Sequence, residues 1–211
     1  MWHSNRAYDV IVISASIKAP VTRVITPLCR SLLSVGVTAN LLSAIGGLGS
    51  SISAIAFFSH GNYFWGMIVT LFFILFDLLD GTLARMSDSG GSKWGALLDS
   101  TLDRISDAAV LGSIIFFLMK THDRLVPVLL VALVAGGLVS YIKARAEGLG
   151  IECNGGLAER TDRLIIIFLA LGLAGIGVSY ALAIGVWVLA VASVYTVCER
   201  LLIVYRATMS S

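Results

Sequence analysis

The chain has 211 residues, of which 57% are hydrophobic and only 13% are charged, with a formal net charge of +2. Soluble domains carry about 25% charged residues, so this composition excludes an ordinary soluble protein. It indicates a single integral membrane domain over residues 1–211, for which we expect no nucleic-acid partner.

The N-terminal tail, residues 1–36, is the most polar long stretch. Within residues 11–36, Lys18, Arg23 and Arg30 interrupt short apolar runs, and two prolines break the pattern. These runs are too short to cross a bilayer, so the stretch predicts an amphipathic helix lying at the membrane surface. The alternative is a loosely ordered cytosolic tail.

Residues 37–206 hold six long apolar stretches that predict a six-helix transmembrane bundle. Each stretch is close to the 20 residues that cross about 30 Å of hydrocarbon. The fold class is therefore predicted to be an all-α integral membrane protein with six transmembrane helices preceded by an interfacial helix. The expected spans are residues 38–59, 63–85, 94–119, 125–146, 160–178 and 181–204.

The placement of the basic residues predicts the orientation. With six spans both termini lie on one side, together with the loops after the second and fourth spans. Of the fifteen Lys and Arg residues, all except Lys120 and Arg124 fall on that side. The positive-inside rule therefore predicts a multi-pass protein of the cell membrane whose termini face the cytoplasm.

Four aspartates lie at the cytoplasmic ends of the second and third spans. Asp77 and Asp80 are three residues apart, and Asp99 and Asp103 are four apart, so each pair shares one face of a helix. An ionised Asp near the middle of a membrane costs roughly 2.5–3.5 kcal/mol. Divalent cations are the expected partners, because they bind carboxylate oxygens.

A second interpretation of these aspartates is structural. They could form an acidic-basic network with Arg85 and Arg104 that holds the helices together. Asp107 continues the face of Asp99 and Asp103 one turn deeper. We interpret Asp107 as a residue that supports the site or pairs two helices.

A basic cluster lies on the same side of the membrane, at the ends of the last three spans. It suits an anionic acceptor that carries its own phosphate. The alternative is that these side chains anchor the protein to lipid headgroups. Its members are Ser140, Lys143, Arg145, Arg160, Arg163 and Arg200.

The acidic segment reads D-x2-D-G-x2-A-R-x9-G-x3-D-x3-D and resembles the signature of the CDP-alcohol phosphotransferase family. That resemblance implies a CDP-linked lipid whose phosphorus is attacked by an alcohol, with release of CMP. It also implies two divalent ions, Mg²⁺ or Mn²⁺, on the four aspartates, and Asp103 as the base that activates the alcohol. The matching positions are Asp77, Asp80, Gly81, Ala84, Arg85, Gly95, Asp99 and Asp103.

Five residues are candidates for contact with the CDP-linked lipid. Gly81 and Gly95 would let a bulky nucleotide approach the helices closely. Arg85 can bind a phosphate through its forked guanidinium group. Asn40 and Thr82 could contact the cytidine or its phosphates, although helix capping or packing explains both equally well.

The strings FDLLDGTLAR, LDRISD, SYIKARAE and ERTDRLI are similar to the phosphatidylinositol phosphate synthases of actinobacteria, a resemblance that covers the chain from about residue 20 onward. It implies CDP-diacylglycerol as donor and inositol 1-phosphate as acceptor, with the basic cluster around the acceptor's phosphate. It leaves open which of Arg160 and Arg163 points into that pocket. Members of the family are commonly dimeric, so a homodimer is expected.

Two other functions remain open from the sequence. Glycerol 3-phosphate would fit the basic cluster too, and the product would then be phosphatidylglycerophosphate. Serine or choline fits less well, because neither brings an anion. A cation transporter could also use aspartates, but transporter carboxylates usually lie near the membrane midplane. Here they lie at one surface beside a loop.

Overall fold

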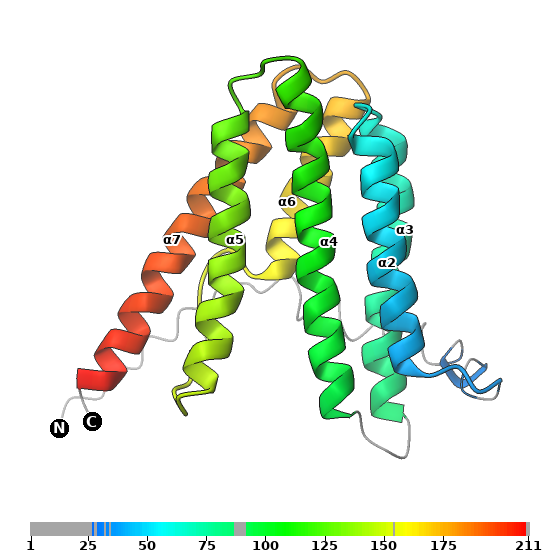
Figure 1. Cartoon of the computed structure of the whole chain (residues 1–211), viewed down its shortest axis with the longest axis vertical. Helices are drawn as coiled ribbons and strands as arrows, with labels where there is room; N and C mark the ends of the chain where they lie inside the picture. The colour runs from blue at the N-terminus through cyan, green and yellow to red at the C-terminus, as the bar shows by residue number, and fades with distance from the viewer. Residues whose placement is uncertain are drawn as a thin grey trace.

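Six α-helices make up most of the chain in the computed structural model (Figure 1). The structure describes residues 35–86, 92–153 and 155–209 and positions 27, 29–31 and 33, without the side chains of residues 77, 78, 84 and 85. The helices are α2 (Ala39–Phe58), α3 (Tyr63–Met86), α4 (Lys93–Lys120), α5 (Val126–Glu147), α6 (Arg160–Gly175) and α7 (Ala181–Met209).

Successive helices run in opposite directions along the long axis of the molecule, so the α2–α3, α4–α5 and α6–α7 turns gather at one end (Figure 1). Helix α2 packs against α3 and α4, while α5 and α6 pack against α7. Contacts of α3 with α6 and of α4 with α5 join these groups. No strand occurs among the described residues, which confirms the predicted all-α class for that part of the chain.

Local sequence signals explain where three of the helices begin. The Thr38 hydroxyl accepts a hydrogen bond from the Leu41 amide at 3.3 Å and caps α2. Ser92 caps α4 in the same way, with the Gly95 amide as donor at 2.9 Å. At the start of α6, Glu159 and the Asp162 side chain form a reciprocal capping box.

Four helices are long and apolar enough to cross a membrane: α2, α3 over Tyr63–Leu83, α5 and α7. The ends of all six helices lie within a few residues of the expected spans, except that α7 continues to Met209. Helix α4 carries several charged residues in its first half, and α6 has only 16 residues. The structure therefore supports four membrane-spanning helices, and six spans stay a prediction.

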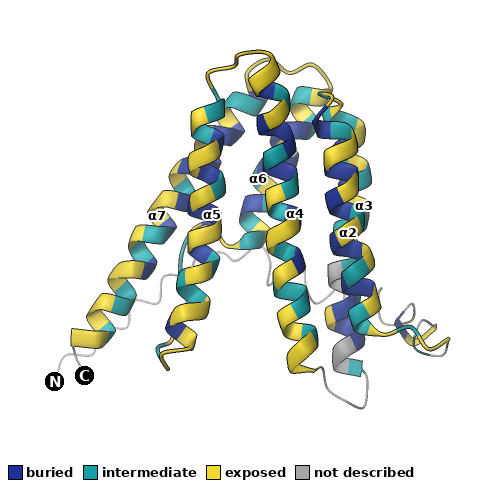
Figure 2. Ribbon diagram, viewed as in Figure 1, coloured by how far each residue is buried: buried dark blue, intermediate teal, exposed yellow. Residues whose placement is uncertain are grey.

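The hydrophobic core lies at the end of the molecule where the three turns gather. Phe58 at the end of α2, Leu118 near the end of α4 and Leu129 at the start of α5 belong to one buried cluster. Leu171 of α6 and Val186 of α7 belong to the same cluster. Large apolar residues are also exposed on all six helices, and Figure 2 shows exposed residues along each of the helices. A buried centre and an apolar outer surface together are typical of a helix bundle surrounded by lipid.

The predicted interfacial helix falls mostly on residues outside the described part of the chain. Its described positions, 27, 29–31 and 33, are helical. Cys29 is fully buried and packs with Leu42 of α2 and Leu83 of α3. This end of the N-terminal segment is thus packed against the bundle, and the amphipathic character of the rest stays a prediction.

Replacing Gly47 with alanine should destabilise the contact between α2 and α4. A Cβ at Gly47 would lie 2.6 Å from the Cβ of Leu102, so the two helices have to move apart. Overpacking of this kind costs about 1–3 kcal/mol, which should lower the unfolding temperature in detergent micelles. Gly112→Ala is the matched control, because a Cβ there meets nothing within 4 Å. Equal unfolding temperatures for both variants would contradict the close packing at Gly47.

Candidate active site

A large cavity opens in the half of the molecule away from the hydrophobic core. It has a volume of about 840 Å³ and lies between α4, α5, the first turn of α6 and α7. Helix α6 begins at Arg160, part-way along the bundle (Figure 1). Residues of its first turn line this cavity. Residues that line the cavity include Thr101, Asp103, Ser140, Lys143, Arg160 and Arg200.

The predicted metal-binding aspartates lie on two helices. Asp80 of α3 is buried, with 5% of its surface exposed, and its carboxylate accepts a hydrogen bond from the Ser43 hydroxyl of α2. Asp99 and Asp103 are half-buried, one turn apart on α4. Asp77 lies on α3, and its side chain is outside the described part of the structure.

The described side chains do not by themselves form a metal cage. Among them, no three His, Cys, Asp or Glu residues come together as a candidate metal site. That set leaves out the side chain of Asp77, so the four-aspartate site stays a prediction. The donor chemistry fits Mg²⁺ or Mn²⁺, because carboxylates supply the oxygen ligands that these ions prefer.

Ion pairs connect the carboxylates of α4 with the arginines at the start of α6. Asp103 Oδ1 lies 2.9 Å from Arg160 Nη2, and Asp107 Oδ2 lies 3.0 Å from Arg163 Nη2. Arg160 Nε is also 3.7 Å from Asp107 Oδ1. The predicted catalytic carboxylate, Asp103, is therefore in direct contact with one of the predicted acceptor-binding arginines, Arg160.

The alternative of a structural acidic-basic network is present in part. Arg104 Nη1 lies 3.6 Å from Asp103 Oδ2, but its closer contact is a 2.6 Å hydrogen bond to the carbonyl of Ser100. The shorter ion pairs run between helices, from α4 to α6, and border the cavity. The network therefore supports the site as well as the packing.

Arg200 is buried and holds the connection between α5 and α6. Its Nε donates to the carbonyl of Gly155 at 2.9 Å, and its Nη1 donates to the carbonyl of Val139 at 2.7 Å. Its Nη2 lies 3.5 Å from a carboxylate oxygen of Glu159. Arg200 thus fixes the loop that carries the start of α6, while also lining the cavity.

The remaining acceptor-binding candidates lie on α5. Ser140 and Lys143 line the cavity. Arg145 is exposed near the end of the helix and is not among the residues that line the cavity. The structure therefore brings most of the predicted cluster to one place, and Arg145 lies beside that place.

The candidates for binding the CDP-linked lipid lie on α2, α3 and α4. Asn40 and Gly95 are neighbours, since a Cβ at Gly95 would lie 2.6 Å from Asn40 Oδ1. Among the described side chains, a Cβ at Gly81 would meet nothing within 4 Å. Thr82 is buried. The side chain of Arg85 is outside the described part of the structure.

Two further residues belong to the site that the sequence alone did not single out. Ser43 contacts Asp80. Its position three residues after Asn40, on the same helix face, is the sequence feature that could have indicated this role. Glu159 contacts Arg200 and caps α6. An acidic residue directly before the first of two arginines could have indicated this role.

The chain resembles phosphatidylinositol phosphate synthases from two actinobacteria. The chain is 39% identical over 197 residues to a phosphatidylinositol phosphate synthase of Corynebacterium glutamicum, covering 92% of this chain and 89% of that protein. A protein of the same name from Mycobacterium tuberculosis is 43% identical over 194 residues, covering 87% of both.

Two crystal structures of the M. tuberculosis phosphatidylinositol phosphate synthase are similar to this one, each at 42% sequence identity. The structure with CDP-DAG bound has a TM-score of 0.82 and covers 87% of this chain and 94% of that one. The complex with manganese and citrate has a TM-score of 0.80 and covers 86% and 88%. The sequence profile of CDP-alcohol phosphatidyltransferase matches residues 36–198. The chain therefore belongs to the CDP-alcohol phosphatidyltransferase family.

Proposed function

We propose that this protein transfers the phosphatidyl group of CDP-diacylglycerol to inositol 1-phosphate, giving phosphatidylinositol phosphate and CMP. The observation that carries this proposal is the contact between Asp103 and Arg160 at the edge of a basic cavity. It places a carboxylate that can accept a proton beside a cation that can bind a phosphate. Relatives that are 39–43% identical over most of the chain are named phosphatidylinositol phosphate synthases.

In the proposed reaction, a hydroxyl oxygen of the acceptor attacks the phosphorus that carries the diacylglycerol. A new P–O bond forms, the bond from phosphorus to the CMP oxygen breaks, and Asp103 accepts the hydroxyl proton. Asp77, Asp80, Asp99 and Asp103 would hold the divalent ions. When bound, such ions offset the negative charge of the pyrophosphate and of the leaving group.

The cavity suits a phosphorylated acceptor better than a neutral one. Arg160, Lys143 and Ser140 supply donors on its walls, and Arg160 comes from the first turn of α6. The N-terminus of a helix favours bound anions, which adds to the charge of the arginine. Glycerol 3-phosphate carries the same kind of phosphate and is the second candidate acceptor.

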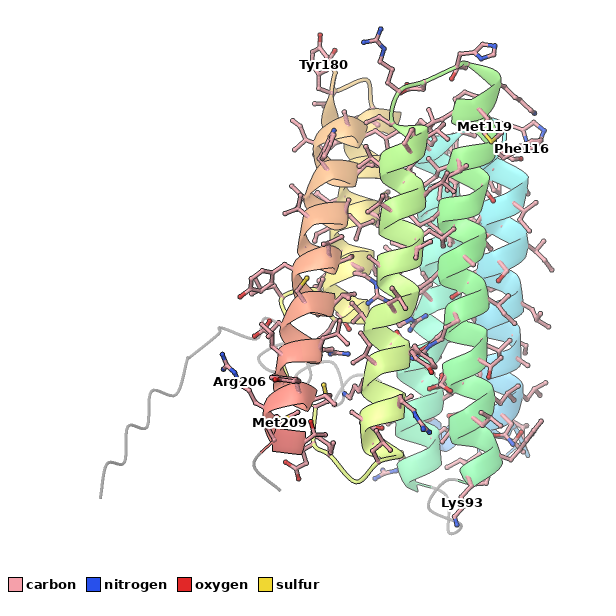
Figure 3. The ribbon with its side chains drawn as sticks, turned by 60° about the vertical axis from the view of Figure 1, so that its left-hand side comes forward. Lys93, Phe116, Met119, Tyr180, Arg206 and Met209 are labelled. Carbon is pink, nitrogen blue, oxygen red and sulfur yellow. The ribbon has the colours of Figure 1, made fainter. Side chains whose placement is uncertain are left out.

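We also propose that this end of the molecule faces the cytoplasm of the cell membrane, with six spans. Lys93 and Arg206 lie toward the same end as the cavity, whereas Phe116, Met119 and Tyr180 lie at the other end (Figure 3). The positive-inside rule then places the cavity where a water-soluble acceptor arrives. A homodimer is part of the proposal, from the family resemblance.

Release of CMP should depend on both the acceptor and a divalent ion. Membranes that contain the protein, given CDP-diacylglycerol and Mg²⁺ or Mn²⁺, should release CMP with inositol 1-phosphate and much less with glycerol 3-phosphate, serine or choline. EDTA should stop the release because the aspartates then lack their cations, and added metal should restore it. Higher rates with glycerol 3-phosphate would contradict the proposed acceptor.

Asp103→Asn should abolish transfer, because an amide cannot accept the hydroxyl proton. We expect a loss of at least about 100-fold in kcat, within the range for a general base. Binding of CDP-diacylglycerol, measured as the rise in unfolding temperature that it causes, should remain detectable. Retained turnover in this variant would refute the role of Asp103.

Lys143→Gln and Arg145→Gln provide a comparison within one helix. Both remove one positive charge near the end of α5, but Lys143 lines the cavity and Arg145 does not. Loss of a charged hydrogen bond costs about 1.5–3 kcal/mol, so Lys143→Gln should raise the KM for inositol 1-phosphate by about 10-fold or more. The increase for Arg145→Gln should be smaller. The reverse order would contradict the placement of the acceptor in this cavity.

A further inference from the structure

Asp107 lies on α4 between the two arginines at the start of α6. Its Oδ2 accepts a hydrogen bond from Arg163 Nη2 at 3.0 Å, and its Oδ1 is 3.7 Å from Arg160 Nε. Asp103, one turn earlier on the same helix, contacts Arg160 from the other side. Arg160 is therefore shared between two carboxylates, whereas Arg163 is bound by Asp107.

The guanidinium group of Arg163 is held from three directions. Besides the contact with Asp107, its Nη1 donates to the carbonyl of Ala158 at 3.1 Å. A Cβ at Gly136 of α5 would lie 3.3 Å from its Nε, so α5 also approaches closely. Only 7% of the surface of Arg163 is exposed. Its orientation is thus determined by a carboxylate, a carbonyl and the packing of a glycine.

The ion pair between Asp107 and Arg163 also lies where two cavities meet. A smaller cavity, about 140 Å³ and mostly apolar, is lined by Asp107, Arg163 and Ser140, and it shares Ser140 and Arg163 with the large cavity. At such a boundary an arginine could point toward either space. The charge of Asp107 favours one arrangement for both arginines, because each would lose an ion-pair partner by turning away.

We propose that Asp107 is a positioning residue that orients Arg160 and Arg163 toward the phosphate of the acceptor, an inference that rests on the proposed function. Arginine side chains carry about 2 kcal/mol of rotamer entropy, and a fixed guanidinium loses less of it on binding.

The test measures CMP release by the full-length protein in lipid nanodiscs, with CDP-diacylglycerol and inositol 1-phosphate varied separately. Asp107→Asn keeps the shape of the side chain and removes its charge. We expect the KM for inositol 1-phosphate to rise by about 10-fold or more, because this factor corresponds to the loss of one charged hydrogen bond. The KM for CDP-diacylglycerol should stay within about twofold of the wild-type value. Asp107→Glu keeps the charge in a shifted position and should raise the acceptor KM by an intermediate factor.

Asp123→Asn is the matched control, because Asp123 lies in the turn between α4 and α5 at the other end of the molecule, where its carboxylate accepts a hydrogen bond from the Leu125 amide. Its acceptor KM should equal that of the wild type. If Asp107 had a purely structural role, its replacement would lower the unfolding temperature and change either both KM values or kcat alone. Any of these results without a selective rise in the acceptor KM would overturn the inference. If Asp107→Asn does not fold, an unchanged acceptor KM in Asp107→Glu would overturn it as well.

The wild-type protein tests the proposed function separately. If CMP release requires glycerol 3-phosphate instead of inositol 1-phosphate, the proposed acceptor is wrong, and the role of Asp107 is then judged on the KM for glycerol 3-phosphate. If an acceptor without a phosphate supports full release, both the proposed acceptor and the role of Asp107 fall. The ratio of variant to wild-type KM thus tests the role of Asp107. The acceptor that supports CMP release by the wild-type protein tests the proposed function.

Discussion

Contact between the carboxylates of α4 and the arginines that open α6 determines how the site is built. Asp103 binds Arg160 and Asp107 binds Arg163, so the two helices are joined at the edge of the cavity. Ion pairs that are partly withdrawn from water stay strong only when both partners remain in place. The same ion pairs therefore hold α4 against α6 and also position charged groups at the cavity.

The position of α6 creates the space for this chemistry. Its 16 residues begin at Arg160, and its first turn faces the cavity between α4, α5 and α7. The α5–α6 connection is held by Arg200, whose guanidinium donates to the carbonyl of Gly155 within the connection and to the carbonyl of Val139 on α5. Burial of these carbonyls costs little free energy, because each accepts a hydrogen bond. A short helix with a fixed first turn thus presents its arginines to a polar space beside the membrane core.

The two ends of the molecule divide packing and function between them. Close contacts of large apolar side chains fill the end with the three turns, where Phe58, Leu118 and Leu129 are buried. The other end contains the cavity with its charged lining and, among the described residues, open space beside Gly81. A well-packed end can hold the helices rigidly while the other end keeps a space open, which is how a rigid scaffold positions a binding site.

The sequence by itself determined the helices and the family, and it predicted the residues proposed for the site apart from Ser43 and Glu159. Apolar stretches of about 20 residues can form little except helices in a membrane, and the spacing of Asp77 to Asp103 is specific enough to indicate the chemistry. Only the tertiary structure decided which side chains meet: that Arg160 binds Asp103, that Arg200 binds backbone carbonyls, and that Arg145 lies outside the cavity lining. Helix periodicity reports the face of a residue on its own helix. The partner of that face depends on how the helices pack, and on where a short helix such as α6 begins.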